Sequence, residues 1–104
     1  MPVKSPAECN TIEEIRAEID RIDRQLLSLL GERFGYVKAI TRFKKTEEDV
    51  RAPQRYQAVL TQRRAWAEDE GLDPDVIEQI YKDLIAYFIA EELKDLPKAS
   101  VNPQ

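Results

Sequence analysis

Two basic side chains, Arg33 and Lys44, fall on the apolar face of a segment in which hydrophobic residues recur every three or four positions. They lie 11 residues apart, so on a continuous helix they differ by only about 20° around the axis. One explanation is that both side chains lay their stems on apolar surface and keep their charged ends in water. The other is that they hold an anion, because two buried cations repel each other unless a negative charge joins them.

A third basic residue, Arg16, lies one position off the same stripe and 17 residues before Arg33, which is about 26 Å along a helix. Two arginines at that distance cannot hold one small molecule from one straight helix. An antiparallel second copy of the helix would instead bring its Arg16 beside Arg33 and Lys44. Because arginine binds a carboxylate through two parallel hydrogen bonds, this arrangement suits a small dicarboxylate.

Arg55 and Glu92 are further candidates for such a site. Arg55 falls in the first turn of a second predicted helix and could add a donor, although a solvated position is the simpler interpretation. Glu92 follows Tyr81, Ile85 and Phe88 on one helical face, so its position points inward although it carries a carboxylate.

Composition excludes several kinds of chemistry. The 104 residues include no histidine and one cysteine, Cys9, which removes catalytic triads with histidine and nearly every zinc site. We therefore expect no metal and no disulfide within the chain. The net charge of −4 argues against nucleic-acid binding, which needs a basic excess. Short, charge-interrupted apolar runs and an N-terminus without a signal core predict a cytoplasmic protein with no membrane span.

Three helices must position these residues. The first is predicted from near Thr11 to near Lys44, with Thr11 as N-cap and Glu14 completing a capping box. Its stripe keeps its phase past Gly31 and Gly35, although each glycine weakens a helix by about 1 kcal/mol relative to alanine. At about 34 residues and about 50 Å it is too long for one small domain. The length therefore predicts a homodimer.

Two shorter helices follow a charged connector at 45–52, which we expect to be a loop that could close over the site. The second helix begins at Pro53 and stops at Gly71, and we expect its Trp66 in the core. The third begins with the Asp-Pro pair at 73–74 and ends before Pro97. The chain then divides into an N-terminal extension (1–10), an all-α helical domain (11–96) and a disordered tail (97–104).

Several stretches resemble the all-helical chorismate mutase family, and most closely its isochorismate–pyruvate lyase branch. They are "IRAEIDRID" (15–23), "GERFGYVKAITRFK" (31–44), "APQR" (52–55), "RAWAEDEGLD" (64–73) and "YFIAEELK" (87–94). The resemblance covers roughly residues 8–95. It implies an intertwined homodimer of three-helix chains, with two equivalent sites shared between the chains and no cofactor.

The resemblance also implies roles for the basic residues. Arg16 from the partner chain and Arg33 match the two arginines of the family that bind carboxylates. Lys44 matches a lysine that bonds the enolpyruvyl ether oxygen and one carboxylate, and Arg55 matches a further arginine. This agrees with the pocket inferred from the spacing of the residues. We expect Lys44 and Glu92 to be the catalytic pair.

Two departures from the family pattern bear on the reaction. Mutases that rearrange chorismate place acidic residues near the start of helix two to hold the ring hydroxyl, where this chain has Ala52 and Tyr56. Isochorismate carries that hydroxyl elsewhere, so the difference favours the lyase. Glu92 stands where lyases and most bacterial mutases have glutamine. A carboxylate cannot donate a hydrogen bond, whereas glutamine or a protonated carboxyl can.

The expected function is therefore a pericyclic elimination that converts isochorismate into salicylate, a siderophore precursor, and pyruvate, with weak chorismate mutase activity. One alternative is a chorismate mutase that makes prephenate. The other is a non-catalytic helical module whose basic residues dock an acidic protein.

Overall fold

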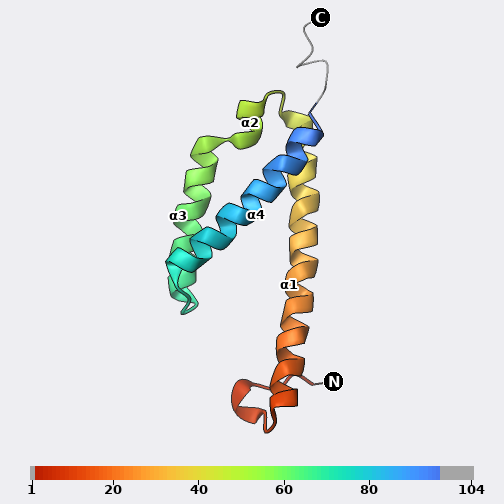
Figure 1. Cartoon of the computed structure of the whole chain (residues 1–104), viewed down its shortest axis with the longest axis vertical. Coiled ribbons are helices and arrows are strands. Elements are labelled where there is room, and N and C mark those ends of the chain that lie inside the picture. The colour runs from red at the N-terminus through yellow and green to blue at the C-terminus, as the bar shows by residue number, and fades with distance from the viewer. Residues whose placement is uncertain (1, 97–104) are drawn as a thin grey trace, which may run out of the picture. The chain divides into compact units, whose positions relative to one another are not determined.

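The computed structural model describes residues 2–96, and these residues are helical with no strand. The elements are the 3₁₀ turn η1 (Pro6–Glu8), α1 (Ile12–Ile40), the 3₁₀ turn η2 (Thr41–Phe43), α2 (Glu47–Arg51), α3 (Pro53–Asp69) and α4 (Pro74–Lys94) (Figure 1). They form two compact parts, divided between Gly35 and Tyr36. The predicted all-α class and its three long helices are confirmed, but the first helix ends at Ile40 and not near Lys44, because the turn η2 follows it. The predicted tail, 97–104, lies outside the described residues.

Helix α1 begins where the capping signal predicts. The hydroxyl of Thr11 accepts a hydrogen bond from the backbone N–H of Glu14 at 3.1 Å, as an N-cap does. The Glu14 carboxylate accepts from the backbone N–H of Asn10 at 2.7 Å, one residue before the cap. The helix continues through Gly31 and Gly35 without a break, because the stripe that it presents keeps the helical period across both.

The apolar stripe of α1 is uncovered in the single chain. No residue of this helix is buried, and the isoleucine and leucine side chains of the stripe are about half exposed, from 45% to 59%. They are Ile12, Ile15, Ile19, Ile22, Leu26 and Ile40. A contiguous apolar surface of this extent is typical of an interaction face. The prediction that one chain is too small to cover its first helix is consistent with this exposure.

The core of residues 36–96 lies where α3 and α4 pack against each other as a helical hairpin, with α2 against α4 (Figure 1). Its buried apolar residues are Val50, Val59, Leu60, Ala67 and Phe88. Gly71, at φ 74°, makes the turn between the two helices. The Asp73 side chain then accepts from the backbone N–H of Asp75 at 2.8 Å, which caps α4 as the sequence predicts.

Ion pairs across the hairpin fix the register of α3 on α4. The Arg64 guanidinium donates to Asp75 at 2.8 Å and to Glu78 at 2.7 Å. Bonds from Lys82 and Arg64 lower the pKa of the Glu78 carboxyl. Trp66, which we expected in the core, is 49% exposed, and the Arg63 guanidinium lies 4.6 Å from its ring centroid. That expectation is wrong for the single chain.

The connector 45–52 is not the loop that its charge suggests. The Thr46 hydroxyl accepts from the backbone N–H of Asp49 at 3.0 Å, and the Asp49 carboxylate accepts from that of Thr46 at 3.2 Å. This reciprocal cap starts α2, and the spacing of a threonine and an acid three residues later is its sequence signal. Val50 is buried and anchors α2, so any closing motion of this segment would have to move a packed helix.

Ala52 joins α2 to α3 in a strained conformation. It is the only residue other than glycine with a positive φ among residues 2–96, at φ 40° and ψ 66°. The left-handed region costs an L-residue about 1–2 kcal/mol, because the Cβ crowds the following carbonyl. This conformation ends α2 and lets α3 begin after a single intervening residue. None of the helices in the described part of the chain is both long and apolar enough to cross a membrane.

We predict that Ala52→Gly raises the free energy of unfolding by about 0.5–1 kcal/mol, because glycine relieves the strain and its extra backbone entropy offsets only part of the gain. Ala52→Val should lower it, since a β-branched residue tolerates this region least. Urea unfolding of both variants measures the difference. Equal stability of all three proteins would show that Ala52 is not strained.

Candidate active site

Lys44 and Glu92 form an ion pair between residues 48 positions apart. Lys44 follows the turn η2 in an extended conformation, and Glu92 lies in the last turn of α4. The Lys44 Nζ donates to the Glu92 Oε2 at 3.2 Å. Glu92 is only 4% exposed and is the one charged residue that is buried in the described part of the chain. The predicted inward orientation of Glu92 is confirmed.

The pair explains how a carboxylate is tolerated in this position. A buried charge without a partner costs several kcal/mol, and breaking a buried pair by removing one partner costs about 3–5 kcal/mol. Lys44 supplies the compensating charge, and its side chain remains 19% exposed. An ammonium group has three donors, so its bond with Glu92 leaves donors for a ligand.

Lys44 and Arg55 line the same hollow, of about 580 Å³. This volume is within the range of pockets that hold small molecules, about 300–1,000 Å³. Its walls come from the segment between the end of α1 and the start of α3: Ile40, Phe43, Lys44, Glu48, Asp49, Ala52, Pro53, Gln54 and Arg55. The structure therefore brings together two of the basic residues that the sequence singled out.

The acidic residues of the hollow are Glu48 and Asp49, both from the connector that was predicted to be a loop. Backbone N–H groups of Lys45 and Thr46, with the charge of Lys44, lower the pKa of the Asp49 carboxyl, so that it is ionised at neutral pH. Two carboxylates thus oppose the charges of Lys44 and Arg55. The lining of the hollow has no excess of positive charge, so a dianionic ligand would need further cations.

A second hollow, of about 390 Å³, lies between α4 and the start of α3. It is mostly apolar and shares Pro53 with the first hollow. Tyr56 lines this second hollow. Among residues 2–96, no three His, Cys, Asp or Glu side chains are grouped so that they could hold a metal ion.

Arg16 and Arg33 lie on α1 within residues 2–35. Arg33 is partly buried, whereas Arg16 is exposed and has no ion-pair partner within residues 2–96. The helix between them is continuous, so its rise separates them by about 26 Å. One chain alone therefore does not place both arginines on one small ligand.

These features define a small all-helical protein with lysine and arginine side chains around a ligand-sized hollow. A model of the family "Chorismate mutase type II" matches residues 15–93. The chain belongs to this family, as its sequence stretches predicted.

Two curated relatives are similar along most of this chain. An isochorismate pyruvate lyase of Pseudomonas aeruginosa is 42% identical over 92 residues, which are 88% of this chain and 91% of that protein. A T-protein of Haemophilus influenzae is 32% identical over 82 residues, which are 78% of this chain but only 22% of the longer T-protein.

Proposed function

We propose that the protein is an isochorismate–pyruvate lyase that converts isochorismate into salicylate and pyruvate, with weak chorismate mutase activity and no cofactor. The observation that carries the proposal is the 42% identity to a lyase across 91% of that protein. The hollow beside Lys44 and Arg55 supports it, because it combines a suitable volume with donors for carboxylates.

The reaction needs no covalent bond between the protein and the substrate. As the ether bond between the ring and the enolpyruvyl group breaks, a ring hydrogen moves to the enolpyruvyl methylene carbon, which leaves pyruvate and an aromatic ring. No nucleophile and no external proton acceptor are required. The protein must fold the substrate into the reactive conformation and stabilise charge on the ether oxygen. A lysine with free donors beside an arginine meets that requirement without histidine.

We infer that two copies of the chain form an intertwined homodimer and share each site. The uncovered stripe of α1 supports this inference, as does the exposure of Arg16, which has no ion-pair partner in the described residues. As the resemblance implies, Arg33 and the partner subunit's Arg16 would each hold a carboxylate of the substrate, while Lys44 contacts the ether oxygen and Arg55 adds a donor.

Chorismate mutase activity is the second candidate, because the family model carries that name. The residues at the positions of the mutase acids, Ala52 and Tyr56, carry no carboxylate to hold the ring hydroxyl of chorismate. This absence favours the lyase reaction over the mutase reaction.

We predict that the purified protein converts isochorismate into salicylate and pyruvate in equal amounts, and converts chorismate into prephenate much more slowly. Salicylate fluorescence and absorbance assays of prephenate measure the two reactions separately. Prephenate as the main product would identify a mutase. Turnover of neither substrate would support a non-catalytic binding module.

We predict that Arg16→Ala and Lys44→Ala each lower kcat/KM by about 10²–10³-fold, because each removes a donor from the bound substrate. An equal mixture of the two variants after subunit exchange should recover about a quarter of the wild-type activity, since half of the dimers are mixed and have one intact site of two. Mass spectrometry of size-tagged chains verifies the exchange. Verified mixed dimers without activity would show that Arg16 does not act across the interface.

The third prediction concerns Glu92. As a carboxylate it accepts a bond from Lys44 but cannot donate one to the ether oxygen, whereas its protonated form can. We therefore expect Glu92→Gln to raise kcat/KM at neutral pH, because the amide accepts from Lys44 and still donates. Steady-state kinetics with isochorismate measures the change.

The neighbouring Glu91, which pairs with Lys94 at 2.9 Å, provides a matched control. Glu91→Gln makes the same chemical change in the pair with Lys94 and should leave kcat/KM at the wild-type value. If Glu92→Gln also left kcat/KM unchanged, Glu92 would act only as the structural partner of Lys44.

A further inference from the structure

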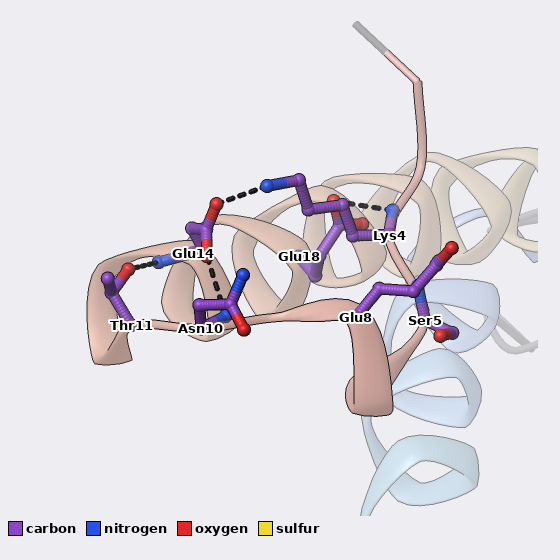
Figure 2. A network of polar contacts seen from close by, with 7 residues as sticks. All are labelled: Lys4, Ser5, Glu8, Asn10, Thr11, Glu14 and Glu18. Carbon is purple, nitrogen blue, oxygen red and sulfur yellow. Dashed lines mark hydrogen bonds and ion pairs between the residues drawn. The ribbon is translucent and has the colours of Figure 1, made fainter.

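The residues before α1 fold back along the start of that helix and are tied to it by polar contacts (Figure 2). The Lys4 ammonium pairs with the Glu14 carboxylate, and the backbone N–H of Lys4 donates to Glu18 at 3.2 Å. The Glu14 carboxylate also accepts from the backbone N–H of Asn10. Residues 3–10, the N-terminal arm, are thus held near both ends by two glutamates one helical turn apart.

Apolar contacts accompany these ties. Val3, Pro6 and Cys9 of the N-terminal arm line a small, almost entirely apolar hollow of about 310 Å³ against α1. The helix contributes Ile15, Ile19 and Ile22 to the same hollow. The arm therefore lies against the apolar stripe at the start of α1, whose isoleucines remain about half exposed.

The pair between Lys4 and Glu14 keeps both groups charged over a wide range of pH. Its hydrogen bond raises the pKa of Lys4 and lowers the pKa of the Glu14 carboxyl. The bonds from Arg21 and the backbone of Lys4 lower the pKa of the Glu18 carboxyl in the same way. The ties that hold the arm are therefore present at neutral pH.

Arg16 lies between the two tied positions. Glu14 and Glu18 share one side of α1, and Arg16 is two residues from each, about 200° around the axis from both. The arm thus fixes the turns that carry Arg16 without covering its side chain, which is exposed. Helix ends fray when nothing holds them, and Arg16 is only in the second turn of α1.

We propose that the N-terminal arm is a positioning element for the shared site. It orders the start of α1 so that Arg16 is presented to the substrate bound by the partner subunit, and Lys4 is its principal positioning residue. The proposal rests on the proposed function. Ordering matters because the apparent affinity for substrate falls in proportion to the fraction of molecules whose binding group is in the competent conformation. Releasing the arm should then raise KM and leave kcat nearly unchanged.

The test uses the full-length chain with Lys4→Pro, which removes both the ammonium and the backbone donor. Its KM for isochorismate should rise at least about threefold, because the variant loses an exposed ion pair and a backbone hydrogen bond. Its kcat should stay within about twofold of the wild-type value. Lys4→Arg, which retains the cation, should keep the wild-type KM. Lys94→Met is the matched control, because it removes the same charge from an exposed pair at the end of α4.

Hydrogen exchange of the amides at 14–18 provides a readout that does not depend on activity. Faster exchange in Lys4→Pro than in Lys94→Met would support the proposal. Unchanged exchange, or an unchanged KM in a protein that Arg16→Ala inactivates, would overturn it and leave the proposed function intact. Full activity of Arg16→Ala would instead refute the shared site, and it would refute the positioning role of the arm as well.

Discussion

The constraint on which the rest of this structure depends is an apolar stripe that one chain cannot cover. Fully burying a leucine or isoleucine side chain stabilises a protein by about 1.5–3 kcal/mol, and along α1 these side chains remain about half exposed. A chain of this size has little stability to spare. In the proposed dimer, the helix that presents this stripe to a second copy also carries Arg16 and Arg33. Stability and substrate binding would then depend on one interface.

The second determinant is the way the chain compensates charge around Lys44. Glu92 is buried against this lysine, and the carboxylates of Glu48 and Asp49 share the hollow with Lys44 and Arg55. Without ligand, the cations are therefore already compensated within the chain. A dianion competes with these carboxylates unless further arginines join the site. In the proposed dimer, this charge balance is a physical reason for a second subunit to complete the site.

The segment between α1 and α3 shows how local chemistry shapes the hollow. The cap of Thr46 and Asp49 starts α2, the buried side chain of Val50 holds it against α4, and Ala52 turns the chain into α3. The spacing of Thr46 and Asp49 predicts the start of this helix. The surrounding charges favour a loop instead, which is why a loop was expected. Trp66 was misplaced for a different reason: its aromatic character indicates burial, but a stacked arginine also covers part of its surface.

The sequence by itself determined the helices and the candidates for chemistry. Helical periodicity, the N-cap residues and the prolines act over a few neighbouring positions, so α1, α3 and α4 and the caps at Thr11 and Asp73 could be predicted. The same periodicity located Arg33 on the helix, and sequence similarity supplied the family. The periodicity was wrong for Lys44, which follows the turn η2 in an extended conformation, beyond the end of α1. Only the tertiary structure decided which candidates meet. The pairing of Lys44 with Glu92 spans 48 positions, the hollow joins Lys44 to Arg55, and Lys4 docks on Glu14. Such contacts depend on how separate segments pack, and a pattern of neighbouring residues does not encode which distant segments meet.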